Sequence, residues 1–140
     1  MSRSAIYVTN TTSQTVNVTN PINLGSIQRR YGCALDLSGY EVRVKDAGYY
    51  DVDASITLTS ATPGEITVTL YKDNVPVQGA TATETIETAD NVINLSIAAI
   101  IRQGCVCCDG DSSLSVILSS PTTAVTSATI NNIGVVVEKL

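Results

Sequence analysis

A strict alternation of apolar and polar side chains over residues 49–59, YYDVDASITLT, constrains the fold more than any other feature of the sequence. Successive side chains of an extended chain point to opposite faces, so this segment has one apolar and one polar face. The pattern predicts a β-strand that packs one face on a core, with these residues pointing inward: Tyr50, Val52, Ala54, Ile56 and Leu58.

The same alternation recurs along the chain between turn residues. Residues 65–72, EITVTLYK, repeat it, and Asp73-Asn74 between Lys72 and Val75 predicts a tight hairpin. No segment has the period of an amphipathic helix. Eight to ten short strands without a helix predict an all-β sandwich, jelly roll or barrel, with further strands at 40–44, 91–101, 114–118 and 133–140.

Two of these strands are apolar on both faces. Val135, Val136 and Val137 are consecutive, and Ile117 lies in the run SVIL. One face of each strand can join the core, whereas the other needs a second cover. A partner chain is the favoured interpretation, because the interfaces of obligate oligomers resemble a core cut in half. A loop of the same chain is the alternative.

Composition limits the partners that a chain of this kind can bind. The 140 residues can bury a core without disulfides or metals. With 13 acidic and 8 basic side chains and a net charge of -5, the chain has no basic face for a phosphate backbone, so nucleic acid is not an expected partner. No apolar run of roughly 18 residues occurs, so no membrane span is expected either. The N-terminus has no apolar signal region, and we expect synthesis in the cytoplasm without a signal peptide.

Residues 1–30 differ from the rest of the chain. The run TNTTSQTVNVTNP is almost wholly polar or β-branched and carries no charge. It is interpreted as an N-terminal arm that reaches a neighbour or a particle, or as edge strands of the domain; the two alternatives stay open. The domain itself is expected over residues 31–140.

The segment 102–111, RQGCVCCDGD, holds three of the four cysteines, Cys105, Cys107 and Cys108. The chain has no histidine, which excludes Ser–His–Asp and Cys–His catalytic sets within one subunit, so an enzyme is not expected. Structural zinc sites separate paired cysteines by about two to four residues, unlike this run. Reduced thiols are favoured in a cytoplasmic protein, and a disulfide from Cys33 to one of the three is the alternative.

Asp109 and Asp111 flank a glycine, as carboxylates do in partial calcium loops. The loop lacks the closing glutamate, because Ser120 occupies that position. Calcium is therefore a weak candidate ligand and no other cofactor is expected; a plain turn between strands explains the same residues.

The order of several short motifs resembles one known family. Ala47-Gly48-Tyr49-Tyr50 precedes the long strand, Asn74-Val75-Pro76-Val77 with Gly79 follows the hairpin, and Val137-Glu138-Lys139 closes the chain. These motifs resemble the C-terminal domain of BclA-type spore-surface glycoproteins, which are bacterial relatives of the complement-q and tumour-necrosis-factor (TNF)-like jelly rolls. The resemblance covers about residues 40–140.

The resemblance implies a TNF-like jelly-roll sandwich of roughly ten antiparallel strands that forms a homotrimer. One of Tyr49 and Tyr50 would then enter the core and the other would lie at the intersubunit surface. Short members of this kind are similar to head-fibre or decoration proteins of tailed phages. We therefore expect a non-enzymatic structural module on a virion surface, attached to a capsid through residues 1–30. The alternatives are a spore-surface (exosporium) component and a module that binds a carbohydrate or host receptor.

Overall fold

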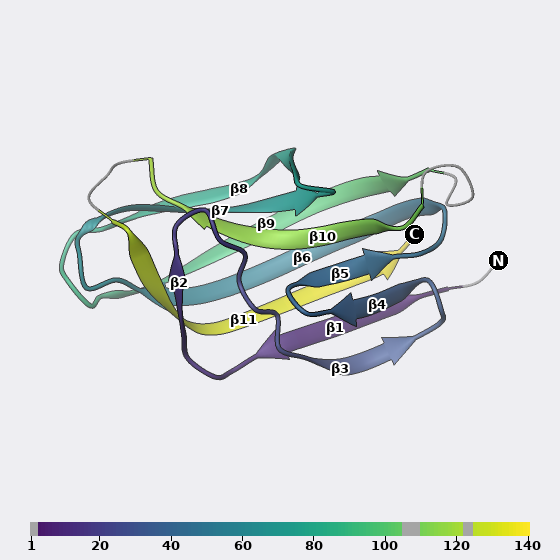
Figure 1. Cartoon of the computed structure of the whole chain (residues 1–140), viewed down its shortest axis with the longest axis horizontal. Helices are drawn as coiled ribbons and strands as arrows, with labels where there is room; N and C mark the ends of the chain where they lie inside the picture. Colours follow the sequence, from purple (N-terminus) through teal and green to yellow (C-terminus); the bar gives the residue numbers. More distant parts are fainter. Residues whose placement is uncertain (1–2, 105–109, 122–124) are drawn as a thin grey trace.

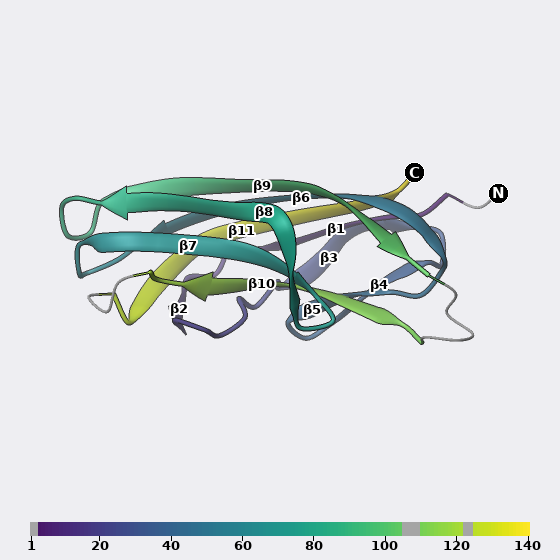
Figure 2. The ribbon, with the colours of Figure 1, turned by 90° about the horizontal axis from the view of Figure 1, so that it is seen from above.

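The computed structural model describes residues 3–104, 110–121 and 125–140, and these form two antiparallel sheets packed face to face (Figures 1 and 2). The strands are β1 (Ala5–Asn10), β2 (Gln14–Asn17), β3 (Ser26–Tyr31), β4 (Leu35–Ser38), β5 (Glu41–Val44), β6 (Gly48–Thr59), β7 (Gly64–Lys72), β8 (Val75–Ile86), β9 (Val92–Gln103), β10 (Ser112–Ser119) and β11 (Ser127–Lys139).

The strand order is that of a jelly roll. Sheet A runs β3-β1-β11-β6-β9, with β2 also paired to β11, and sheet B runs β4-β5-β10-β7-β8. The first and last strands of the chain, β1 and β11, are neighbours in sheet A. The predicted all-β class is confirmed. None of the described segments forms a helix of the length and apolar character that a membrane span requires.

The central strands form where the alternation predicts them. All five inward residues of β6 are buried, from Tyr50 to Leu58. The hairpin between β7 and β8 turns at Asp73 and Asn74, whose φ angles are 52° and 66°. Positive φ at both central residues is the type I′ geometry that suits the twist of two paired strands, which is why Asp-Asn is found here.

The N-terminal segment is built into the sandwich. β1 lies between β3 and β11, with Ile6 opposite Val137, and both Ile6 and Val8 are fully buried. Ile22 and Leu24 also belong to the core. The expected division at residue 30 is therefore absent from the structure, because the apolar residues of this segment complete the core and its backbone completes sheet A. Within this segment, β3 lies at one edge of sheet A, and β9 lies at the opposite edge.

The two chain ends are fixed beside the start of β6. The Lys139 amide donates to the Ser4 carbonyl oxygen at 2.8 Å, and the Lys139 ammonium contacts the Asp46 carboxylate at 2.8 Å. The hydrogen bond from Lys139 is the main cause that lowers the pKa of Asp46. The buried Tyr50 hydroxyl donates to the Asp46 carbonyl oxygen at 2.8 Å, and burial, followed by the Asp46 charge, raises the pKa of Tyr50 to about 12.

Candidate functional site: an apolar face on sheet A

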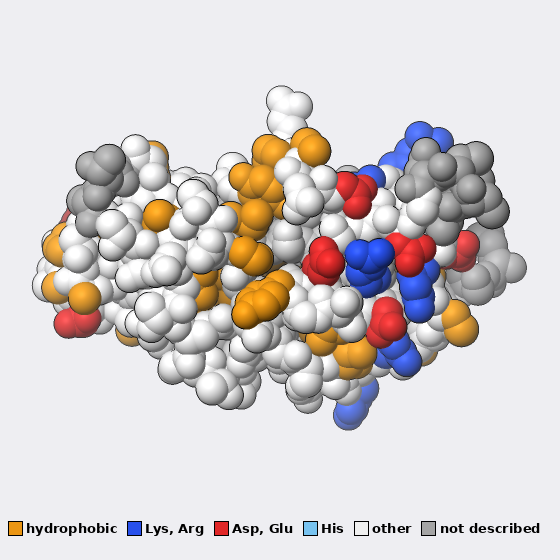
Figure 3. Space-filling model, viewed as in Figure 1, with side chains coloured by type: hydrophobic (Ala, Val, Ile, Leu, Met, Phe, Trp, Pro, Cys, Tyr) orange, Lys and Arg blue, Asp and Glu red, His pale blue; other side chains and the backbone are white. Residues whose placement is uncertain are grey.

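The outer faces of the two sheets differ in chemistry. On sheet B, Thr67 and Thr69 of β7 pair with Thr83 and Thr81 of β8 through hydroxyl hydrogen bonds of 2.7 and 3.0 Å. Figure 3 views this sheet and shows a largely uncharged surface, with hydrophobic side chains across its middle and charged side chains gathered near β4 and β5. These side chains pair among themselves, as Arg30 does with Asp36 at 2.8 Å. The threonine hydroxyls and the charged side chains of this face thus pair largely with one another.

The outer face of sheet A instead presents apolar side chains to solvent. One cross-strand row holds Tyr7 of β1, Val136 of β11, Asp53 of β6 and Ala98 of β9 in register. Tyr7 and Val136 are 41% and 38% exposed. Exposed large apolar side chains continue along the same face at Tyr31, Tyr49 and Ile100. Large exposed apolar patches on soluble proteins mark interaction sites, so these side chains are candidates for an interface.

Small residues in the next row hollow this face into a groove. Gly134 of β11 faces Ser55 of β6, which faces Ser96 of β9. The Tyr7 ring borders this row, because a methyl group placed at Gly134 would lie 3.6 Å from the ring carbon Cε1. The resulting groove has a volume of about 410 Å³, with Tyr7, Val136 and Ala98 among the residues that line it. It offers an apolar, shaped surface, and Asp53 is the charged residue among those that line it.

Acidic side chains accompany the groove. Asp53 lines it, and Asp51 and Glu138 lie opposite each other in the adjacent row. Among the described residues, none of the three carboxylates has a cationic partner within 4.0 Å. A carboxylate that becomes buried in an interface needs a cation or hydrogen-bond donors from the covering surface. Whatever covers this face must therefore supply such groups opposite Asp53.

The structure distributes the predicted interface residues over three places. Tyr50, Val135 and Val137 are in the core, whereas Tyr49 and Val136 face outward from sheet A. Ile117 belongs to β10 in sheet B, where it is half-buried and forms a bridge with Pro21. The candidates for core or interface thus lie on two sheets, and Ile117 is flanked by a loop of its own chain, as in the alternative interpretation.

The predicted thiol and calcium candidates fall mostly outside the described residues. Cys105, Cys107, Cys108 and Asp109 lie in the segment 105–109, which the structure does not describe. Cys33 is exposed and forms no disulfide within the residues that the structure describes. Asp111 contacts the Arg43 guanidinium at 3.9 Å. In the described part of the chain, no three His, Cys, Asp or Glu side chains come together as a metal site would require.

Sequence reasoning missed Tyr7 and Ala98 as members of the apolar face. Each looks unremarkable in its own segment, and only the register of β1, β11, β6 and β9 places them in one row. The signal that could be read from sequence was the central member of the valine run, since in an extended strand Val136 must face away from its two neighbours.

The strand order and the two packed sheets define a jelly roll of the TNF and complement-q type. No family model matches the sequence, and no curated protein matches it. Among solved structures, the chain is similar to the globular domain of zebrafish complement 1qA, with a TM-score of 0.72 at 10% identity over 99% of this chain and 97% of that one. It is also similar to the Eiger TNF of S. frugiperda, with a TM-score of 0.65 at 16% identity over 99% and 91%.

A third similar structure is the PRD1 vertex protein P5, with a TM-score of 0.61 at 13% identity over 98% of this chain and 96% of that one. At such identities the likeness establishes the fold. The relationship to BclA-type domains and the phage setting stay predictions.

Proposed function

We propose that the protein is a non-enzymatic structural module that forms a homotrimer through the outer face of sheet A and is displayed on the surface of a larger particle. The observation that carries this proposal is the apolar groove around Tyr7, Gly134 and Val136. A second copy is the occupant that best suits it, because the same chain supplies exposed arginines such as Arg29 and Arg102, which can pair with the free carboxylates. The fold supports the proposal, since the family resemblance implies trimers.

We infer that the three copies close as a ring. Asp51 and Asp53 lie on β6 in the outer face of sheet A, whereas Arg29 lies on β3 at one edge of this sheet and Arg102 lies on β9 at the other, so the carboxylates of one copy can meet the cations of the next. A head-to-tail contact brings unlike surfaces of two copies together, and such contacts close as rings when the rotation permits.

The trimer is tested with a charged side chain in the groove. Wild-type protein should show by light scattering a mass of three times the 14.7 kDa chain, about 44 kDa. Ala98→Arg should give a folded monomer, because Ala98 is exposed and its replacement disturbs only the surface that the neighbour covers. Ser115→Arg places the same cation on the outer face of sheet B and should remain trimeric. A monomeric wild type, or a trimeric Ala98→Arg variant, would refute the proposal.

The particle is proposed to be a phage capsid, on which the module acts as a head fibre or decoration protein. The similarity to a vertex protein, PRD1 P5, supports this setting. Mass spectrometry of purified virions from the source should detect the chain, and its gene should lie among capsid genes. A location among genes for spore-coat proteins would favour the exosporium alternative instead.

A further inference from the structure

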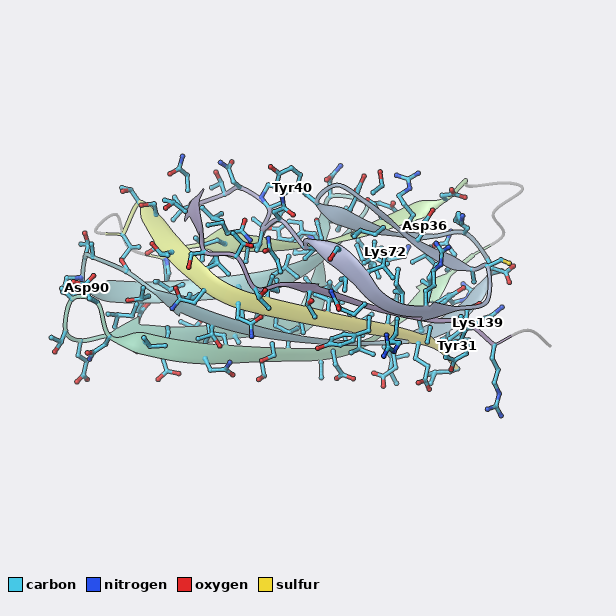
Figure 4. All side chains as sticks on the ribbon, turned by 90° about the horizontal axis from the view of Figure 1, so that it is seen from below. Tyr31, Asp36, Tyr40, Lys72, Asp90 and Lys139 are labelled. Carbon is cyan, nitrogen blue, oxygen red and sulfur yellow. The ribbon has the colours of Figure 1, made fainter. Side chains whose placement is uncertain are left out.

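A second groove, of about 310 Å³, lies on the opposite side of the sandwich from the apolar face. It is formed by β2, by the loop that follows it and by Tyr40, with these lining residues: Gln14, Thr15, Val16, Asn17, Asn20, Pro21 and Tyr40. Tyr40 stands in the turn between β4 and β5, and Figure 4 shows it on the sheet B side, well away from Tyr31. The groove is therefore separate from the proposed trimer surface.

The loop that forms one wall is held firmly by β10. The Thr19 amide donates to the Leu118 carbonyl oxygen at 2.6 Å, and the Leu118 amide donates to the Asn20 carbonyl oxygen at 3.3 Å. The Ile22 amide donates to the Val116 carbonyl oxygen at 2.9 Å. This loop connects β2 to β3, which are not neighbours in the sheet, and it is hydrogen-bonded to β10 on the way. The wall is thus preorganised, which lowers the entropic cost of binding a ligand.

Thr19 has a backbone conformation that threonine rarely adopts. Its φ is 73°, in the left-handed region where a β-branched side chain is strained by about 1 kcal/mol or more. The hydrogen bond to Leu118 holds it there. Strained residues of this kind concentrate at binding sites, and Thr19 lies between Asn17 and Asn20, which are joined by a hydrogen bond from the Asn20 amide to the Asn17 carbonyl oxygen at 3.2 Å.

The groove offers unused hydrogen-bonding groups. Asn17 and Asn20 are exposed, and within the described chain their side-chain amides have no protein partner. Each amide provides two donors and one acceptor oxygen. Gln14, in contrast, is occupied: its amide donates to the Asn23 carbonyl oxygen at 2.9 Å and its oxygen accepts from the Asn23 amide at 3.1 Å. Gln14 therefore shapes the wall, and the two asparagines are available to a ligand.

Tyr40 supplies the apolar contact. Tyr40 is 51% exposed and lines the groove together with Asn17 and Asn20. No residue that lines the groove carries a formal charge. An aromatic ring beside free amides suits a ligand with an apolar face and several hydroxyl groups, and the absence of charge disfavours phosphate or carboxylate groups.

We infer that this groove binds a neutral saccharide, whose ring face stacks on Tyr40 and whose hydroxyls hydrogen-bond to Asn17 and Asn20. The inference goes beyond the proposed structural role and does not depend on it. In a trimer that is closed through sheet A, three such grooves stay accessible, so weak single sites would add to a stronger multivalent attachment.

The first experiment uses an array of immobilised neutral hexose and N-acetylhexosamine oligosaccharides, with sialylated and sulfated oligosaccharides as the charged arm. The wild-type protein should bind members of the neutral set. Saturation-transfer NMR with the best free neutral sugar then measures affinity in solution. Absence of binding to every neutral glycan, or preferential binding to the charged glycans, would overturn the inference.

The second experiment places the binding in the groove. Tyr40→Ala should weaken binding about tenfold or more, as expected for a lost aromatic contact, and Tyr40→Phe should retain most of it. Asn20→Ala should weaken binding, whereas Asn91→Ala, an exposed asparagine outside the groove, should not. Tyr31→Ala is the aromatic control in the free-sugar NMR measurement, which does not depend on the trimer face where Tyr31 lies; Tyr31 is 55% exposed. Unchanged binding by Tyr40→Ala with a wild-type melting temperature would refute the site.

The monomeric Ala98→Arg variant separates the two proposals. It should bind the free sugar with wild-type affinity in NMR but lose most of its signal on the array, because only avidity depends on the trimer. If the wild type is monomeric and yet binds the free sugar through Tyr40, the saccharide site stands and the trimer fails. If the trimer forms and no sugar binds, the trimer proposal stands and the saccharide site fails.

Discussion

The substitution Val8→Ala tests how much the N-terminal strand β1 contributes to the free energy of unfolding. Val8 is 0% exposed, and its β1 position lies opposite Ile27 of β3 and Val135 of β11. Replacement by alanine removes two buried methyl groups, each worth about 0.8 kcal/mol in transfer free energy. The cavity left among these packed neighbours adds to that, so the expected loss is about 2–3 kcal/mol of unfolding free energy. For a chain of this size the melting temperature should fall by about 6–10 °C.

The control carries the same chemical change at an exposed site. Val75 begins β8 and is 62% exposed, so Val75→Ala should alter stability by no more than about 0.5 kcal/mol. Urea unfolding of both variants at one fixed protein concentration measures the difference, because oligomer stability depends on concentration. If residues 1–30 were a free arm, the two variants would behave alike. A Val8→Ala variant within about 0.5 kcal/mol of wild type would refute the role assigned here to β1.

Two further substitutions test turns and titratable groups. Gly25→Ala should lose well over 1 kcal/mol in urea unfolding, because at φ +80° its new Cβ would clash with the Thr9 carbonyl oxygen. Gly79→Ala, at φ +83° with nothing within 4 Å, should lose only the conformational cost of about 1 kcal/mol. Equal losses would contradict the clash. Burial opposes ionisation of Asp73, but hydrogen bonds from the Ser113 amide (3.0 Å) and the Ser112 hydroxyl (2.8 Å) outweigh it and lower its pKa. Because the pKa of Asp73 is lower in the folded state, its ionised carboxylate stabilises the protein above the unfolded pKa, which is near 4. This stabilisation is lost as the pH falls through the folded pKa. Asp73→Asn, which keeps a turn-forming residue, should therefore be less stable than wild type near pH 7. The difference should shrink as the pH falls below the unfolded value of Asp73 in parallel denaturation curves; a constant difference would contradict this role.

The strands that could be predicted from sequence are those whose alternation is complete within one segment. Residues 48–59 and 64–72 carry branched apolar side chains inward and Asp, Ser or Thr outward, so the period of two is unambiguous. Asp73-Asn74 adds a local turn signal that fixes the register of β7 and β8. In these regions the physics is local, and reasoning from the sequence placed both the elements and their buried faces.

The N-terminal region could not be placed in this way. β1 alternates Ile6 and Val8 with Tyr7, but an outward tyrosine blurs the contrast between its two faces. Its main partner, β11, lies at the other end of the chain, and no local pattern specifies such a distant pairing. Ile22 and Leu24 are buried in a segment without regular strand structure, where periodicity carries no information. The polar composition around them therefore left an arm and edge strands as open alternatives.

The two candidate surfaces show what the pairing register of the strands adds to the pattern of apolar residues in the sequence. The valine run predicted a second apolar face at Val136, and the structure shows that register extends it to Tyr7 on one side and Ala98 on the other. No sequence pattern indicates the groove at Tyr40, because its walls come from the loop after β2 and from the turn between β4 and β5. Such a site exists only once the chain is folded.

The positions of these two surfaces also constrain how they can interact. They lie on opposite sides of a sandwich whose sheets pack about 10 Å apart, and the interior between them is close-packed. Substitutions at sites this far apart, with no shared contacts, combine additively in stability. A double variant Ala98→Arg/Tyr40→Ala should therefore show the separate defects of each single variant in mass and in free-sugar affinity, with no further loss. A large non-additive term would mean that the loop after β2 responds to the neighbour seated on sheet A, and assembly and recognition would then be coupled through β11, the one strand that pairs with both β1 and β2.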